Sequence, residues 1–461
     1  MKKYYIGIDL GTSSLKALAL YKDGECINAK KRYEKEGTEG WKIALKGALS
    51  ELFESISPEM IAGVGFSSQV GTYITDSGEV IGWNSSAGKD ELDEIKSKIS
   101  QDEFIKELDM PHPDIISYPL PRLRYIKKNY PNCKRVVMPK ELLIKELTGE
   151  LVTDNFSQRG IAHTKNGEYS KALLEKLGLN FELAPIKSPT DLAGYTTEYA
   201  EKEYGLKKTT PVYLGCNDFF AGLIGMGITK ADKVFDLSGT SEHIGKISNE
   251  FETGNFVSGR FFEGFIAYGG TKASGVSSSF AIENFGLSDV TAELVLDNPP
   301  IFLPYLKGER APIYDENAKG VFFGITDKTD KKLMAYSVLE GIVFSLYDIA
   351  QSLNIKGADK MICGGGSAND MVMARLKAEL FGCEIVGVLN NETSALGAAM
   401  LASVGAGEFK NLTDAAEKVV KYKTLTEPSG SLRDILLKRF AIYKSLYANL
   451  KQNFVDFSNI Q

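Results

Sequence analysis

The chain has 461 residues, of which 43% are hydrophobic and 25% charged, and this composition is typical of globular proteins. Its length exceeds what one ordinary hydrophobic core supports, so we expect two domains of roughly 200 residues each. The net charge of −6 and the dispersed Lys and Arg residues argue against a nucleic-acid partner.

Cysteines and histidines are few and scattered. The five cysteines lie far apart without a Cys-x-x-Cys pair, and the three histidines are isolated. This usage predicts reduced thiols in the cytosol and argues against a zinc site. The apolar start of the chain is interrupted at Asp9, and no other run of about 18 apolar residues occurs, so we expect neither a signal peptide nor a membrane span. The chain is therefore predicted to be cytoplasmic.

Strands and helices alternate in the first half of the chain. Residues 4–8 and 15–20 are predicted strands that flank a turn at Gly11-Thr12-Ser13-Ser14. Apolar residues at helical spacing between Trp41 and Ile56 predict a helix. The other predicted elements are a strand at 61–66, a hairpin around 73–81, helices at 90–99, 120–129, 140–148 and 170–177, a strand at 211–214 and a Gly-rich helix from about Asp218.

The second half restarts the same pattern, with strands at 233–237 and 243–247 around a Gly-Thr-Ser turn. The segment around Asp236 therefore resembles the segment around Asp9. This echo indicates two related domains, with a chance likeness of two hairpins as the alternative. The later predicted elements are a strand at 259–267, a long helix at 330–353, a strand at 361–363, helices at 369–381 and 394–403, and an amphipathic stretch at 431–453.

Both Gly-Thr-Ser turns are candidate phosphate sites. A tight turn of this kind points several backbone N–H groups in one direction and forms an anion-binding concavity, although an ordinary hairpin is the simpler explanation of each turn alone. The chain contains neither Gly-x-x-x-x-Gly-Lys-Ser/Thr nor a Gly-x-Gly-x-x-Gly between a strand and a helix. Any phosphate binding must therefore use the two turns.

Two further motifs follow predicted strands. Gly364-Gly365-Gly366 permits a flat ligand to approach the backbone, or simply makes a tight turn. Asn369 then either caps a helix or contacts a base. Asp218 begins a helix, where an N-cap is the simpler role and a carboxylate beside an attacking hydroxyl is the functional one.

In this order, the motifs resemble the FGGY carbohydrate kinase family, which belongs to the actin, hexokinase and heat-shock chaperone superfamily. The resemblance extends over nearly the whole chain. The matching segments are 6–16, 138–140 with 147–150 and 153–154, 215–218, 237–241, 302–306 with 308–310 and Pro312, 320–324 with 338–341, 364–369, and 395–399.

The resemblance implies ATP and Mg²⁺ as cofactors and suggests a role for each motif. Asp218 would be the general base that accepts the proton of the sugar hydroxyl, and Asp9 would hold Mg²⁺ through water. Lys16 would offset phosphate charge or would be a solvated strand residue. The residues implied for phosphate binding are Gly11, Thr12, Ser13, Gly239 and Thr240, and those implied for adenosine binding are Gly365, Gly366 and Asn369.

The sugar-contacting segments depart from the family pattern. Many members carry Gln-Met-His-Gly where this chain has Gln69-Val70-Gly71-Thr72, and Trp-x-Asp-x-Arg where it has Trp83-Asn84-Ser85-Ser86-Ala87. Glycerol kinases carry Arg-Glu near the first of these places, and neither residue is present here, so glycerol is disfavoured as substrate and the case for xylulose is weakened. Loss of a carboxylate that would bind sugar hydroxyls should change specificity strongly. Either the pocket takes another sugar through Gln69, Thr72, Trp83 and Asn84, or sugar phosphorylation has been lost.

The architecture implied by the resemblance is two actin-like (ribonuclease H-like) α/β domains, each a mixed five-stranded sheet between helices, with ATP and sugar in an interdomain cleft. The expected boundaries are 1–228, 229–428 and a C-terminal helix within 429–461 that packs back on the first domain. The expected activity is ATP-dependent phosphorylation of a ketose, polyol or related sugar, with a xylulose-like substrate as the leading guess. An ATP-binding regulator or scaffold on the same fold is the alternative. Homodimers are frequent in the family.

Overall fold

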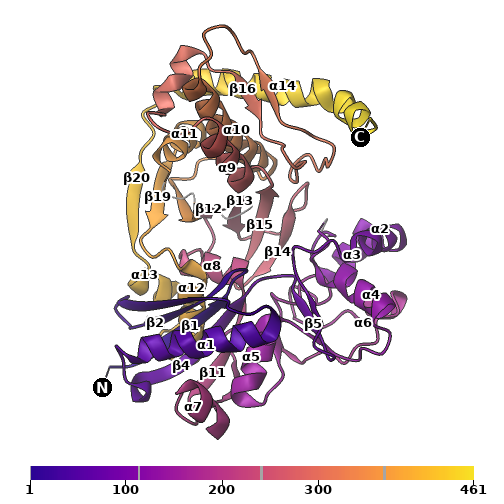
Figure 1. The fold of residues 1–461 in the computed structure, drawn as a ribbon, viewed down its shortest axis with the longest axis vertical. Coiled ribbons are helices and arrows are strands. Elements are labelled where there is room, and N and C mark those ends of the chain that lie inside the picture. The colour runs from indigo at the N-terminus through magenta and orange to yellow at the C-terminus, as the bar shows by residue number, and fades with distance from the viewer. Residues whose placement is uncertain (1, 113–114, 239–241, 367–369, 461) are drawn as a thin grey trace. The chain divides into compact units, whose positions relative to one another are not determined.

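The computed structural model describes residues 2–112, 115–238, 242–366 and 370–460, which form two compact units (Figure 1). Unit 1 consists of residues 1–229 and 392–421, and unit 2 of residues 230–391 and 422–461. The chain therefore passes between the units three times. Each unit contains one large mixed sheet with its own hydrophobic core.

The sheet of unit 1 has six strands in the order β10-β11-β4-β1-β2-β3. The strands β1, β2 and β3 form an antiparallel meander, while β4 and β11 continue the sheet in parallel. β10 is added antiparallel at the edge. The bounds are β1 (Tyr4–Leu10), β2 (Ser14–Leu20), β3 (Cys26–Arg32), β4 (Ile61–Ser68), β10 (Leu192–Tyr195) and β11 (Pro211–Asn217).

The central strands of this sheet are buried on both faces because helices cover them. The amphipathic helix α1 (Gly37–Phe53) packs on β2 and β3, and α12 (Thr393–Gly405) packs on β1 and β4. The approach of α12 is close because glycines face it: a Cβ atom on Gly7 would lie 1.8 Å from the Ala395 carbonyl oxygen, and one on Gly65 would lie 2.3 Å from that of Ala398. Small side chains at this contact are therefore required.

A second, smaller core in unit 1 lies beyond β4 in the sequence. It forms between short helices and a three-stranded sheet in the order β6-β5-β7. The elements of this part are β5 (Tyr73–Thr75), β6 (Val80–Ile81), α2 (Lys89–Lys98), α3 (Gln101–Leu108), α4 (Pro119–Asn129), β7 (Val136–Val137), β8 (Thr153–Asp154), α6 (Lys171–Lys176) and β9 (Ile186–Lys187). The helix α5 (Pro139–Thr148) lies between β7 and β8 in the sequence but packs into the main core of unit 1. Unit 1 is completed by η1 (Pro58–Met60), α7 (Glu198–Tyr204), α8 (Asp218–Gly225) and α13 (Leu412–Val419).

The sheet of unit 2 has seven strands in the order β14-β15-β13-β12-β18-β19-β20. Its strands are β12 (Lys233–Ser238), β13 (Glu242–Ser248), β14 (Val257–Phe261), β15 (Gly264–Thr271), β18 (Lys360–Gly365), β19 (Glu384–Val388) and β20 (Tyr422–Thr426), and β16 (Ile301–Leu303) pairs separately with β17 (Val321–Phe323). Its helices are α9 (Ser274–Asn284), η2 (Ala292–Asp297), α10 (Lys331–Ser352), α11 (Met371–Phe381) and α14 (Arg433–Ser458).

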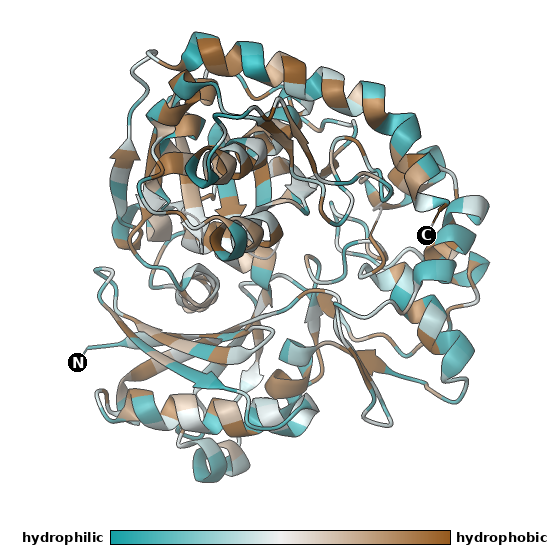
Figure 2. Cartoon of the chain, turned by 45° about the horizontal axis from the view of Figure 1, so that its top comes forward, coloured by the Kyte–Doolittle hydropathy of each residue, from teal (hydrophilic) through white to brown (hydrophobic). Residues whose placement is uncertain are grey.

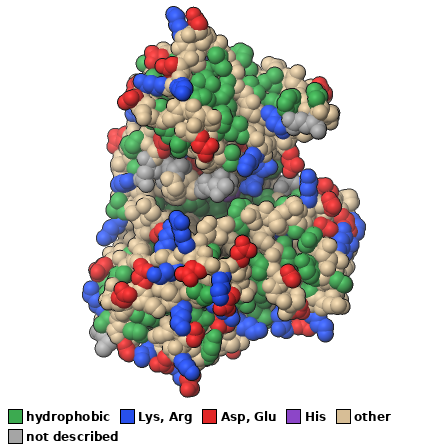
Figure 3. All heavy atoms as spheres, in the orientation of Figure 1, with side chains coloured by type: hydrophobic (Ala, Val, Ile, Leu, Met, Phe, Trp, Pro, Cys, Tyr) green, Lys and Arg blue, Asp and Glu red, His purple; other side chains and the backbone are tan. Residues whose placement is uncertain are grey.

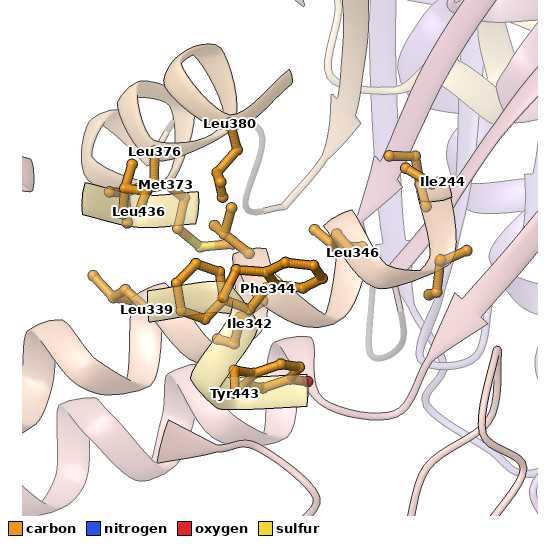
Figure 4. Close-up of a cluster of buried hydrophobic side chains, with 14 of the residues drawn as sticks. Ile244, Leu339, Ile342, Phe344, Leu346, Met373, Leu376, Leu380, Leu436 and Tyr443 are labelled. Atoms are coloured by element: carbon orange, nitrogen blue, oxygen red, sulfur yellow. The ribbon is translucent and has the colours of Figure 1, made fainter. Parts of the chain in front are cut away.

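The long helix α10 is the centre of the unit 2 core. By length and composition it could cross a membrane, but 83% of its most apolar window is buried within the protein. Its residues Leu339, Ile342, Phe344 and Leu346 point into the cluster drawn in Figure 4, together with side chains from α11 and α14. We therefore describe α10 as a core helix.

The two large sheets repeat one topology. In both, three antiparallel strands are followed by two parallel ones, in the orders β3-β2-β1-β4-β11 and β15-β13-β12-β18-β19. Asp9 and Asp236 lie on corresponding first strands. This agreement favours the predicted relation between the halves over a chance likeness of two turns. The predicted five strands form the centre of each sheet, and the additional strands β10, β14 and β20 are antiparallel edges.

The two units divide the chain differently from the predicted domains in two places. Residues 392–421 were expected in the second domain, but α12 covers the sheet of unit 1. The C-terminal helix was expected on the first domain, but α14 packs on β16 and α11 of unit 2. Hydrophobic and hydrophilic residues alternate along α14 (Figure 2), and its apolar side joins the unit 2 core.

A buried ion pair anchors α14 and gives a test of this packing. The Arg439 guanidinium donates to both carboxylate oxygens of Glu340 on α10, each at 2.7 Å, and to the Pro300 carbonyl oxygen at 3.0 Å. We expect Arg439→Met to lower the stability of unit 2 by about 3 kcal/mol, because it leaves the Glu340 carboxylate buried without its cation. Thermal unfolding measures the effect, with exposed Lys438→Met as the control. A Glu340→Met/Arg439→Met double variant as unstable as the single one would contradict this explanation.

Candidate active site

The turn between β1 and β2 presents backbone N–H groups to solvent. Its carbonyl groups are already bonded: the Gly11 oxygen accepts the Tyr33 hydroxyl at 2.9 Å, the Ser13 oxygen accepts the Tyr33 N–H at 3.3 Å, and the Ser14 oxygen accepts the Gly11 N–H at 3.1 Å. Thr12 and Ser13 are exposed, and no partner for their N–H groups is found among the described residues. A turn with occupied carbonyls and free N–H groups has the chemistry of an anion site.

Asp9 lies near the end of β1, directly behind this turn. Its side chain is 5% exposed and accepts the Ser67 hydroxyl at 2.9 Å. Burial raises the pKa of the Asp9 carboxyl, and the Lys16 charge opposes this rise. Lys16 is paired with Asp9 across the hairpin, and its Nζ lies 2.6 Å from Glu392 Oε2. The Lys16 side chain is 29% exposed, so its ammonium group is ion-paired and also partly solvated.

Asp218 is the first residue of α8, and the neighbouring residue takes the capping role. The side-chain oxygen of Asn217 accepts the Phe220 N–H at 3.1 Å, so Asn217 is the N-cap. The strand reaches this point through Gly215 at φ +66°, where a Cβ atom would lie 1.7 Å from the Phe66 carbonyl oxygen. The simpler role weighed for Asp218, an N-cap, is therefore wrong, and its carboxylate is available for other contacts.

The surroundings of Asp218 shift the pKa of its carboxyl towards neutral pH. Burial and, second, the charge of Asp9 raise the pKa of Asp218 to about 7. The backbone N–H groups of Phe219, at 2.9 Å from Oδ1, and of Val70 act in the opposite direction. A strongly perturbed carboxyl beside a second carboxylate is a frequent property of catalytic sites.

A cavity of about 580 Å³ in unit 1 is bordered by the turn and by the segments that depart from the family pattern. The Trp83 indole N–H donates to Thr12 Oγ1 at 3.1 Å, so it joins the turn to the cavity wall. Thr72 is 1% exposed, and its hydroxyl accepts the Trp83 N–H at 3.1 Å. The predicted residues on this wall are Thr12, Ser13, Gln69, Thr72, Trp83 and Asn84.

The remaining wall was missed by the sequence reasoning. It comes from the connection between β3 and α1, with Tyr33, residues 34–37 and Trp41. This segment carries no recognisable motif, and only the antiparallel pairing of β3 with β2 brings it beside the turn. Asp9 and Asp218 do not line the cavity, although Asp218 is bonded to the backbone of Val70, next to Gln69.

The candidate nucleotide residues of unit 2 are described only in part. Gly365 ends β18 at φ +88° and is paired with Ser238 on β12, and a Cβ atom on it would lie 1.8 Å from the Ser238 carbonyl oxygen. Gly366 has open space around it. Asp370 caps α11 by accepting the Met373 N–H at 3.0 Å. The predicted residues Gly239, Thr240 and Asn369 lie outside the described residues.

Asp236, the counterpart of Asp9 in unit 2, has a different environment. Lys377 of α11 donates to Asp236 and, at 2.8 Å, to Glu242 Oε1, and all three side chains are buried. Burial and the nearby Glu242 raise the pKa of the Asp236 carboxyl. No cluster of three or more His, Cys, Asp or Glu side chains suited to a metal occurs in the described parts of the chain. Asp236 is therefore already bonded to a protein cation, whereas Asp9 accepts the Ser67 hydroxyl.

Models of one family match both halves of the chain. The N-terminal domain of the FGGY family of carbohydrate kinases matches residues 4–225, and its C-terminal domain matches residues 239–406. The fold and these matches define a carbohydrate kinase with two domains of the actin-like type. The chain belongs to the FGGY family of carbohydrate kinases.

Similar proteins are named for two sugar substrates. A xylulose kinase of Staphylococcus epidermidis is 26% identical, over 100% of this chain and 99% of its own. The structures of a gluconate kinase and of a ligand-bound xylulose kinase, both from Lactobacillus acidophilus, each match with a TM-score of 0.88 and 25% identity, over 99% of this chain and 100% of theirs. These likenesses extend over whole chains and leave the sugar open.

The raised pKa of Asp218 predicts a pH-dependent gain in stability on its removal. In the unfolded chain the carboxyl titrates near pH 4, whereas in the folded chain its pKa is about 7. Between these values the folded state binds more protons, so ionisation of Asp218 destabilises the fold as the pH rises through this window. We expect the melting temperature of Asp218→Asn, relative to the unmodified protein, to rise from about pH 4 to about pH 7 and then to level off.

The control for this measurement is Asp102→Asn, the same substitution at an exposed first-turn position of α3. A difference in melting temperature between Asp218→Asn and the unmodified protein that stays constant over the whole pH range would contradict the buried, charge-coupled environment of Asp218.

Proposed function

We propose that the protein transfers the γ-phosphoryl group of ATP to a hydroxyl of a neutral ketose or polyol, with xylulose as the first candidate. The proposal rests on the cavity of unit 1, because this cavity is bordered both by the anion-binding turn and by the polar wall predicted for sugar binding. Membership of the FGGY family supports phosphoryl transfer, and the xylulose kinase relatives favour this sugar.

Asp218 is the proposed general base. Phosphoryl transfer needs little covalent chemistry from the protein beyond positioning, charge stabilisation and a group that accepts the proton of the attacking hydroxyl. A carboxyl with a pKa of about 7 is half ionised near neutral pH, so it can take this proton and release it again.

The chain supplies two sets of groups for ATP and Mg²⁺. In unit 1, the N–H groups of Thr12 and Ser13 bind phosphate oxygens, and Asp9 holds the hydrated metal ion. The metal ion supplies charge neutralisation on the phosphates. Lys16 exchanges its Glu392 partner for phosphate charge. In unit 2, the proposed phosphate residues are Gly239 and Thr240, and the proposed adenosine residues are Gly365, Gly366 and Asn369.

The charge around the cavity favours a neutral sugar over a sugar acid. Its wall contains Glu34 and Glu36 and only one cation, Lys35. A carboxylate such as that of gluconate would meet net repulsion there, whereas hydroxyl groups can donate to these acids and to Gln69. Thr72 contributes by orienting Trp83, since its own hydroxyl is already bonded.

Other properties follow from the same function. We propose a cytoplasmic location, which a reaction that consumes ATP and the five free thiols support. On the face shown in Figure 3, Lys and Arg alternate with Asp and Glu without a large patch of one sign, so this face offers no electrostatic site for nucleic acid. A homodimer is proposed from the family resemblance alone.

Substitution of the base tests the catalytic role. We expect Asp218→Asn to fold and to lower kcat by roughly 10²–10⁴, because the amide cannot accept the hydroxyl proton. Sugar-dependent release of ADP is the measurement, and Asp102→Asn is the matched control. Retention of more than half the activity in Asp218→Asn would remove it from this role.

A substrate panel tests the sugar. We expect kcat/KM for xylulose, or for another neutral ketose or polyol, to exceed that for gluconate by at least tenfold, the effect of about 1.4 kcal/mol of charge repulsion. The panel compares pentuloses, hexuloses, tetruloses, polyols and gluconate by ADP release. Higher kcat/KM for gluconate would overturn the charge argument, and ATP binding without ADP release on any sugar would favour the regulator or scaffold.

A further inference from the structure

Arg122 on α4 is a fully buried cation beside the cavity wall. Its side chain is 0% exposed, and its guanidinium donates to the loop that follows Trp83. Nη1 bonds to Ser85 Oγ at 2.7 Å and to the Ala87 carbonyl oxygen at 2.6 Å, while Nη2 bonds to the carbonyl oxygens of Trp83 at 2.9 Å and Ser85 at 3.2 Å. One side chain thus holds the whole loop 83–87.

This guanidinium has no carboxylate partner within salt-bridge distance in the described part of the chain. Burial lowers the pKa of the Arg122 guanidinium. A buried charge without an opposite charge is costly unless dipoles replace its hydration. The carbonyl groups and the hydroxyl of loop 83–87 are these dipoles, so the conformation of the loop and the burial of Arg122 depend on each other.

Trp83 links loop 83–87 to the candidate site by hydrogen bonds. The Trp83 carbonyl oxygen accepts a hydrogen bond from the Arg122 guanidinium. The backbone N–H of Trp83 donates to the Thr72 hydroxyl, and the indole N–H of Trp83 donates to the Thr12 hydroxyl in the turn between β1 and β2. Trp83 and the adjacent Asn84 line the cavity. A continuous series of hydrogen bonds therefore runs from α4 to the turn between β1 and β2.

We propose that Arg122 is a positioning residue for sugar recognition, which fixes Trp83 against the cavity and against Thr12. It supplies from a helix the charge that the loop itself lacks, because positions 85 and 87 hold Ser and Ala. The inference rests on the proposed function for its kinetic consequence, while its structural part, the immobilisation of Trp83, can be tested without any substrate.

The chain offers a direct probe, because Trp41 and Trp83 are its only tryptophans. In a Trp41→Phe background the fluorescence reports on Trp83 alone. We expect Arg122→Lys to increase acrylamide quenching of Trp83 at least twofold, because a lysine ammonium cannot bond to all four acceptors of the guanidinium. Ser85→Ala removes one acceptor and should cause a smaller increase. Arg124→Lys is the matched control: Arg124 lies on the same helix and bonds to Glu94 and to the Leu177 carbonyl oxygen.

The kinetic measurements use the protein with both tryptophans, not the Trp41→Phe background. We expect Arg122→Lys to raise KM for the best sugar by about tenfold or more, the effect of losing one or two charged hydrogen bonds, while kcat changes less than KM. Trp83→Phe keeps an aromatic ring but loses the bond to Thr12. In the double variant, the fold-increase in KM should be smaller than the product of the fold-increases caused by Trp83→Phe and Arg122→Lys alone, because both substitutions act through one contact.

The outcomes separate the two proposals. Unchanged quenching in both Arg122→Lys and Ser85→Ala would overturn the positioning role, as would a lowered melting temperature with an unaltered sugar KM. If Arg122→Lys fails to fold, Ser85→Ala alone decides, by the acrylamide quenching of Trp83 and by the KM for the sugar. Increased quenching in a protein that phosphorylates no sugar would leave Arg122 as the anchor of Trp83 and would refute the proposed function instead.

Discussion

The candidate site depends on backbone-to-backbone contacts that only glycine permits. α12 approaches β1 and β4 through Gly7 and Gly65, and it approaches α8 through Gly225 and Gly397, where added Cβ atoms would lie 1.9 Å and 1.8 Å from carbonyl oxygens. The Ser394 hydroxyl on α12 also donates to the Asp218 carbonyl oxygen at 3.0 Å. α12 therefore packs both on β1, which carries Asp9 near its end, and on α8, which begins at Asp218.

This close packing accounts for the unequal electrostatics of the two related sheets. In unit 1, the buried Asp9 and the half-buried Asp218 interact electrostatically, and Lys16, the cation that acts on Asp9, is shared with Glu392. The pKa of both carboxyls is therefore raised, that of Asp218 to about 7. In unit 2, Lys377 neutralises the corresponding Asp236. The two first-strand carboxylates therefore differ in their bonded partners, Lys377 for Asp236 and the Ser67 hydroxyl for Asp9, although both units share one strand order.

Much of the fold could be predicted because it is encoded locally. The apolar runs of β1, β4 and β11 and the turn at Gly11 are visible in the sequence, and so is the repeat around Asp236. The predicted strand at 259–267 was wrong in one respect: it is two strands, β14 and β15, that reverse at Phe262 with φ +48°, where no turn residue marks the break. The assignment of α12 to unit 1 was equally inaccessible, because it depends on which distant backbone has glycines in contact with it.

The loop 83–87 shows why a local motif is a poor guide to specificity in this chain. Read alone, the segment has lost a carboxylate and a guanidinium, which suggests an impaired sugar site. In the fold, Arg122 lies 37 residues away from Ser85 in sequence and supplies a guanidinium to the same loop. No pattern within the loop could reveal this partner, since the link requires α4 to pack beside it. The charge balance of a binding wall is a property of the packed surroundings, so the segment departs from the family pattern without becoming disordered.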